Sequence, residues 1–130
     1  MSLNVKSYAL GRIQSEEIGT IIPLDVSKAK EYQNELIKIM VDMKMKNYKV
    51  NTLNKIHSSN GQWLFLTDTN KIGHLLLCSP NYPASSASRL LFEISEEVEK
   101  TVPKYYLEGV SLEKLDQKIK NLMVSYNQDP

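Results

Sequence analysis

A histidine and a cysteine are the side chains whose types could support catalysis. His74 and Cys78 lie four residues apart in one apolar run, and a thiolate beside an imidazole can act as a nucleophile with its base. We expect this run to be a β-strand, in which residues four apart share a face but are separated by about 13 Å. That distance is too long for a hydrogen bond, so we interpret both residues as buried core.

The remaining sequence offers no pattern of residues that would assemble a reactive centre. No metal-ligand spacing, glycine-rich phosphate loop or hydrolase elbow occurs. His57 lies beside an expected turn and has no partner in the pattern, and Trp63 and Phe65 are interpreted as core. We therefore expect a protein that is not an enzyme and uses no metal or cofactor.

A helical segment from Lys28 to Lys46, capped by Asp25 or Ser27, carries more apolar residues than one buried face requires. At about 100° per residue, one apolar stripe faces a sheet. It comprises Ala29, Tyr32, Leu36, Ile39, Met40 and Met43. A second stripe of Ile37, Val41 and Met45 lies on the far side. It is either covered by a loop of the same domain or binds a helix or extended segment of a partner.

Charged residues divide between this helical region and a later one. The first is basic, through Lys28, Lys30, Lys38, Lys44, Lys46 and Lys49. These lysines form a solvated surface or, alternatively, attract anionic membrane lipids. The later region is acidic, through Glu93, Glu96, Glu97 and Glu99. We interpret it as solvated, with a basic partner as the alternative. The net charge of +1 gives no sign of nucleic-acid binding.

The length of 130 residues corresponds to one domain, here residues 1–130, with 42% hydrophobic and 24% charged residues. One cysteine permits no internal disulfide and fits a reducing compartment. No run approaches the ~20 apolar residues that span a bilayer, and the first ten residues are not a signal peptide. No lipidation motif stands at either end, so we expect a soluble chain. The polar end at Asn127–Pro130 fits either an internal domain edge of a longer protein or a natural terminus.

Hydrophobic periodicity predicts five strands and three helices. We expect strands at 5–13, 18–24, 48–56, 63–67 and 72–79 and helices at 28–46, from Pro83 to 101–103, and from Leu112 after a Ser111 cap. A loop holding Tyr105, Tyr106 and Gly109 would join the last two helices. The strands at 63–67 and 72–79 are apolar on both faces, which places them mid-sheet between helices. The order β-β-α-β-β-β-α-α indicates an α+β fold, with a five-stranded antiparallel sheet between one helix and two helices.

This order resembles the longin fold, a profilin-like sandwich. Leu75-Leu76-Leu77, then Asn81-Tyr82-Pro83 and a helix carrying Ala87, Leu90 and Leu91, is similar to a strand, Tyr-Pro and helix of longin SNAREs. Leu115-Asp116 followed by Ser125–Pro130 looks like the segment before the SNARE helix in the lipid-anchored longin R-SNAREs, the synaptobrevin homologues without a membrane span. Ser27-Lys28-Ala29-Lys30 departs from the phenylalanine-rich helix entry of that branch.

The resemblance implies a non-catalytic, N-terminal regulatory domain of a vesicle-fusion SNARE. Its implied binding groove lies between the first helix and the third strand, and holds the protein's own SNARE segment or a lipid chain. The corresponding residues are Leu36, Ile37, Met40, Val41, Met45, Val50 and Leu53. The implied partners are the SNARE motif in cis, other SNARE or trafficking proteins, and a membrane reached through a lipid anchor outside this chain. Nucleic acid is not among them.

The implied location is the cytosolic face of Golgi, ER or endosomal vesicle membranes. The principal alternative function is a longin-type subunit of a vesicle coat or tethering complex. An enzyme of related sandwich architecture is a third alternative, but it would need a convergent polar site.

Overall fold

The computed structural model describes residues 4–108 and 113–128, with side chains for residues 4–101 and 113–128. Its elements are β1 (Val5–Arg12), β2 (Glu17–Pro23), a short 3-10 helix η1 (Val26–Lys28), α1 (Ala29–Lys46), β3 (Asn54–Ser58), β4 (Gly61–Thr67), β5 (Ile72–Cys78), α2 (Ala84–Glu108) and α3 (Glu113–Gln128). The α+β class is therefore confirmed. Asp25 accepts a hydrogen bond from the backbone N–H of Ser27 and caps η1, which leads directly into α1.

The five strands form one antiparallel sheet in the order β2-β1-β5-β4-β3, as expected for the strand number and direction. The hairpins β1-β2, β3-β4 and β4-β5 join strands that are neighbours in sequence. The remaining pairing, between β1 and β5, joins the N-terminal hairpin to the other three strands. The β1-β2 register shifts at Leu10/Gly11, which marks a β-bulge. This order leaves β2 and β3 as the two edges and places the apolar β4 and β5 inside, as predicted.

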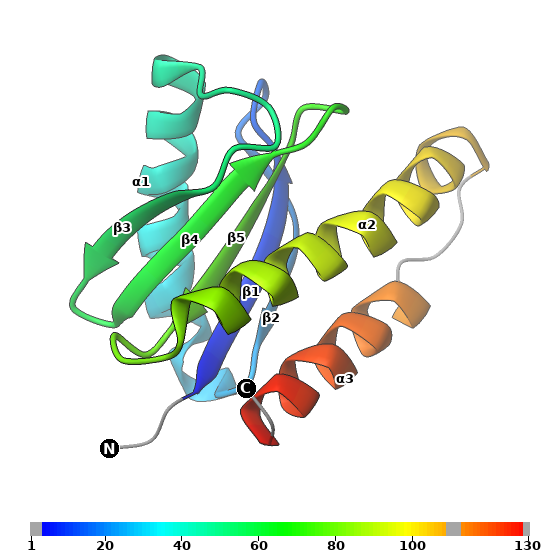
Figure 1. Ribbon diagram of the computed structural model, residues 1–130. Helices are drawn as coiled ribbons and strands as arrows, with labels where there is room; N and C mark the ends of the chain where they lie inside the picture. Colours follow the sequence, from blue (N-terminus) through cyan, green and yellow to red (C-terminus); the bar gives the residue numbers. More distant parts are fainter. Residues whose placement is uncertain (1–3, 109–112, 129–130) are drawn as a thin grey trace.

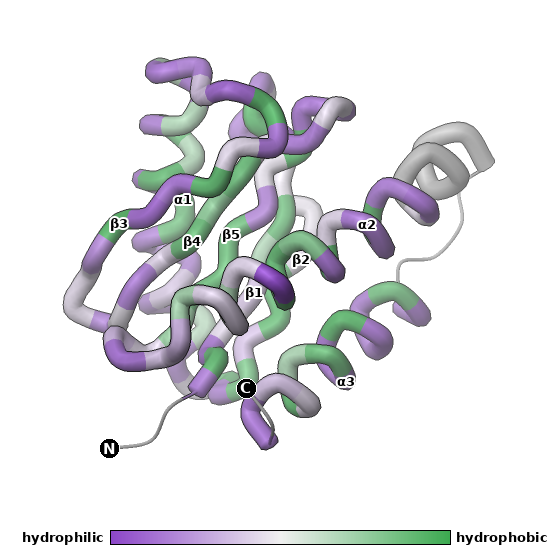
Figure 2. The backbone as a smooth tube through the Cα atoms, viewed as in Figure 1, coloured by the Kyte–Doolittle hydropathy of each residue, from purple (hydrophilic) through white to green (hydrophobic). Residues whose placement is uncertain are grey.

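Helix α1 covers one face of the sheet, and α2 and α3 cover the other (Figure 1). Because side chains alternate along a strand, each inner strand contributes to two apolar layers. Trp63, Phe65 and Leu75 point to α1, whereas Leu64 and Leu76 point to α2 and α3. Figure 2 shows hydrophobic residues along the inner strands and hydrophilic residues at many of the turns and on the outer sides of the helices.

The third strand lies later in the chain than predicted. We expected it over 48–56, but β3 spans Asn54–Ser58. Helix α1 ends at Lys46. Its C-cap residue Asn47 has a left-handed φ of 49°, and Asn51 has a second left-handed φ of 57°. These two positions turn the chain, so the alternation of Tyr48, Val50 and Thr52 belongs to a loop. Tyr48 instead packs edge-on against Phe65, with 5.6 Å between ring centroids.

The second helix is longer than predicted. We expected it to end at 101–103, but α2 continues to Glu108, so the expected loop residues Tyr105 and Tyr106 are helical. Pro103 lies within this helix. A proline removes one intrahelical hydrogen bond and crowds the carbonyl four residues earlier, but it does not by itself end a helix. At the other end, Pro83 precedes the helix, and its carbonyl accepts a bond from Ala87 N–H at 3.0 Å. The Ser111 cap, Leu112 and Gly109 lie outside the described residues.

Candidate functional site

Three of the seven residues predicted to line a groove pack in or against the two apolar layers of the core rather than on the exposed side of α1. Leu36 and Met40 are at most 1% exposed, in the layer between α1 and the sheet. Leu53 is half-buried and packs against the other apolar layer, beneath α2 and α3. The structure therefore does not bring the seven residues together on one surface.

The other four residues keep accessible apolar surface. Ile37 is 42% exposed, Met45 is 80% exposed, Val50 is 47% exposed, and Val41 is half-buried. Ile37, Val41 and Met45 are spaced four residues apart and form one row along α1, which we call the outer row. No loop seals Ile37 or Met45, so the outer row meets the requirement for a docking surface.

One flank of α1 is bonded to β3 and its neighbours through polar groups. Glu35 accepts hydrogen bonds from Ser58 Oγ at 2.9 Å, Asn60 Nδ2 at 2.9 Å and Trp63 Nε1 at 2.7 Å. Asp42 lies about two turns further along the same side and accepts a bond from Tyr48 Oη at 3.2 Å. The side of α1 that faces β3 is thus occupied by contacts within the domain.

The outer row faces away from that flank. Lys44 forms an ion pair with Glu16 of the β1-β2 turn at 3.5 Å, which places the Lys44 side of α1 toward β1 and β2. Ile37 precedes Lys44 by seven residues and therefore lies on the same side of the helix. The structure does not place Ile37 in a groove between α1 and β3; the exposed apolar surface is the outward and β2-facing side of α1.

Four cavities lie elsewhere on the described part of the chain. None of the four is lined by Ile37, Val41 or Met45. Val50 contributes to one of about 100 Å³, between the end of α1 and the β4-β5 turn. The outer row is thus an exposed helical surface that lies outside these four cavities.

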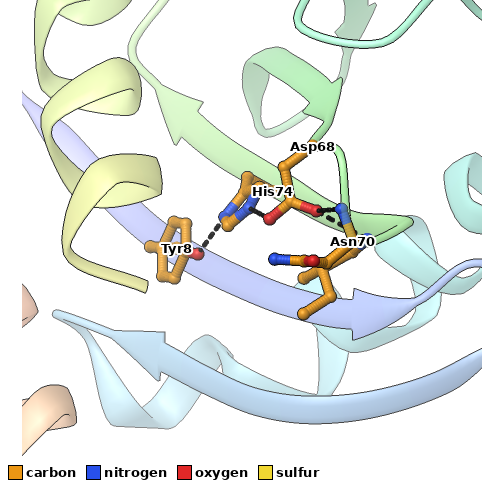
Figure 3. Close-up of polar contacts among 5 residues, drawn as sticks. Tyr8, Asp68, Asn70 and His74 are labelled. Carbon is orange, nitrogen blue, oxygen red and sulfur yellow. Dashed lines mark hydrogen bonds and ion pairs between the residues drawn. The ribbon is translucent and has the colours of Figure 1, made fainter. Parts of the chain in front are cut away.

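A buried chain of hydrogen bonds crosses the other face of the sheet (Figure 3). Tyr8 Oη lies 2.7 Å from His74 Nδ1, and His74 Nε2 lies 2.8 Å from Asp68 Oδ2. Asp68 Oδ1 accepts from the backbone N–H groups of Asn70 at 2.8 Å and Ile72 at 3.1 Å. Burial, followed by the charges of Asp68 and Asp116, raises the pKa of Tyr8 well above its usual value.

This Asp-His-Tyr arrangement has the connectivity of a proton relay, but all three side chains are 0% exposed. No substrate atom can reach them in this conformation, so the network stabilises the β4-β5 turn and the adjoining strands. His74 and Cys78 are both buried, which confirms their interpretation as core. Burial raises the pKa of the Cys78 thiol to about 12, so little thiolate exists at neutral pH.

Sequence analysis missed the polar contacts of Asp68 and Glu35. Asp68 stands at one end of a short hairpin turn and His74 lies just beyond its other end, and this spacing was an available signal for their contact. Glu35 had no such signal, because its three donors lie more than twenty residues away in the chain.

Two further observations concern metals and membranes. Among residues 4–108 and 113–128, no three His, Cys, Asp or Glu side chains gather closely enough to hold a metal ion. No helix in the described part of the chain is both long and apolar enough to cross a bilayer.

In comparisons with known proteins, no protein-family model and no curated sequence matches this chain.

Proposed function

We propose that this chain is a non-catalytic longin-type domain that regulates a vesicle-fusion SNARE by binding a helical or extended segment on the outer row of α1. The proposed partners are the protein's own SNARE segment, other SNARE or trafficking proteins, or a lipid chain. The proposed location is the cytosolic face of Golgi, ER or endosomal vesicle membranes, reached through a lipid anchor outside this chain.

The observation that carries the proposal is the outer row itself. Ile37 and Met45 remain exposed on a helix whose opposite stripe is fully committed to the core. Methionine suits a surface that accepts varied partners, because its side chain is flexible and polarisable. The antiparallel sheet between one helix and two helices is compatible with a longin-like fold, which supports the proposal through fold analogy.

The expected affinity is modest. A partner that covers roughly 200 Å² of apolar surface gains about 5 kcal/mol at ~25 cal/mol per Å² before ordering costs are subtracted. A SNARE regulatory domain must release its segment during fusion, and a weak interaction permits that release. We therefore expect binding that is easily detected only when the segment is tethered or abundant.

The test is a titration of the isotope-labelled domain with synthetic SNARE helices from each SNARE class, followed by NMR. We expect the largest shifts at residues 37, 41 and 45. Ile37→Asp with Val41→Asp should abolish them while the far-UV circular dichroism stays unchanged. Val124→Asp is the matched control, because Val124 is 40% exposed on α3.

Two results would contradict the proposal. Unchanged affinity in the Ile37→Asp, Val41→Asp variant would remove the outer row as the binding surface. Failure of every SNARE helix to bind the wild-type domain would remove the SNARE function.

A further inference from the structure

We propose that the outward surface of α1 docks on an anionic lipid bilayer, with the outer row entering the headgroup region and lysines facing lipid charges. This inference goes beyond the proposed function and does not depend on it. It requires only that the domain meets a membrane carrying acidic lipids.

Lysines flank the outer row at helical spacing. Lys30 precedes Ile37 by seven residues, and Lys38 precedes Met45 by seven, so both lie beside the row along α1. Both are exposed, and neither forms an ion pair with any described residue. Lys44 is also exposed but is paired with Glu16. Glu31 lies beside Lys38 at the margin of this surface and subtracts one charge from it.

The distribution of charge over the molecule orients this surface. Residues 28–49 hold six lysines against three carboxylates, a net charge of +3, whereas the whole chain carries +1, which leaves −2 for the other residues. On the opposite face of the sheet, residues 84–101 of α2 and 113–128 of α3 together carry six carboxylates against five basic side chains, a net charge of −1 (Figure 1). An anionic surface therefore attracts the α1 face in preference to the face covered by α2 and α3, which turns the outer row toward the membrane.

The arrangement of apolar and basic side chains on this surface matches that of helices that bind bilayers. Amphipathic helices that bind membranes lie in the interface with apolar side chains buried and lysines on the flanks. Ile37, Val41 and Met45 line none of the four cavities described above, so the outer row is available as an exposed helical surface. An acidic helix of another protein is the other class of occupant, and the experiment separates the two.

The experiment is co-sedimentation of the domain with phosphatidylcholine vesicles that contain or lack phosphatidylserine, at low and at high salt. We expect partitioning only with phosphatidylserine, weakened by salt. Each lysine near such a surface contributes about a fivefold increase in partitioning, so Lys30→Gln with Lys38→Gln should lower it about 25-fold. The matched control is Lys114→Gln with Lys120→Gln, which removes two exposed lysines from α3.

Equal partitioning with and without phosphatidylserine would overturn the inference, as would an equal loss in the two lysine variants. The Lys30→Gln, Lys38→Gln variant also separates this inference from the proposed function, because it retains the apolar row that a SNARE helix requires. If that variant no longer binds a SNARE helix that the wild-type domain binds, and the wild-type domain binds no vesicle, the lysines contact a protein partner and membrane docking is excluded.

Discussion

Asp68 connects a tight turn to the interior of the sheet. One carboxylate oxygen accepts two backbone N–H bonds within the turn, and the other contacts His74. A buried carboxylate loses its hydration, so these donors must replace water. Tyr8 extends the chain of bonds beyond His74 and contributes one bond to it.

Replacement of Asp68 should therefore cost more than replacement of Tyr8. We expect Asp68→Ala to lower the free energy of unfolding by about 3 kcal/mol, because it leaves buried donors without an acceptor. Tyr8→Phe removes one bond and should cost about 1 kcal/mol. Urea unfolding measures both. Asn70→Ala is the control, since the Asn70 backbone N–H still reaches Asp68; equal losses in all three variants would refute a network centred on Asp68.

The contacts of His74 show which side-chain contacts can be predicted from the sequence and which cannot. Spacing along one strand correctly separated His74 from Cys78, because the rise per residue in a strand is fixed. The contact with Asp68 depends instead on the β4-β5 register, in which Leu66 pairs with His74. That register was not specified by two strands that are apolar on both faces, because a shift by one residue leaves both faces apolar.

At the scale of elements, Glu35 fastens α1 to the β3-β4 hairpin. Its three donors come from both strands of the hairpin and the turn between them. Trp63 is fully buried, so its indole N–H would have no acceptor if Glu35 were removed. Because β3 is a five-residue edge strand paired only with β4, this link to α1 secures the edge of the sheet.

We expect Glu35→Ala to reduce the free energy of unfolding by about 2 kcal/mol and to speed amide hydrogen exchange in β3 more than in β5. Glu31→Ala is the matched control, because Glu31 is exposed on the same helix. Hydrogen exchange followed by NMR checks both variants. A uniform increase in exchange across the whole sheet would show that Glu35 contributes to global stability rather than to attachment of the hairpin.

The positions of helices and strands were predicted correctly where the hydrophobic pattern was clear. Strands β1, β4 and β5 and helix α1 follow from their apolar patterns, and their bounds agree with prediction to within two residues. The third strand was misplaced because the left-handed turns at Asn47 and Asn51 interrupt an alternation that is itself ambiguous. The end of α2 was misplaced because Pro103 was treated as a stop, whereas tertiary context decides whether a proline ends a helix.

At the scale of the whole molecule, the two apolar layers share one sheet. Leu36 of α1 and Leu90 of α2 are both fully buried, but on opposite faces. The inner strands contribute alternate side chains to each layer, so neither layer persists without the backbone that supports the other. The amphipathic patterns were sufficient to predict this layering, because the main apolar stripe of each helix must be covered by the sheet or by another helix.

The shared sheet leads to a prediction about cooperativity. Leu36→Ala and Leu90→Ala should each lower the free energy of unfolding by about 2–5 kcal/mol, which corresponds to a loss of roughly 7–18 °C in Tm. Trp63 is the single tryptophan and points to the α1 layer, so its fluorescence reports that side, while far-UV circular dichroism reports the helices of both sides. We expect the two signals to change at the same temperature in both variants, because a single domain of this size unfolds as one unit. If Leu90→Ala melted by circular dichroism well before Trp63 fluorescence changed, the α2 and α3 layer would be an independent unit, and α1 with its outer row could remain folded and functional without it.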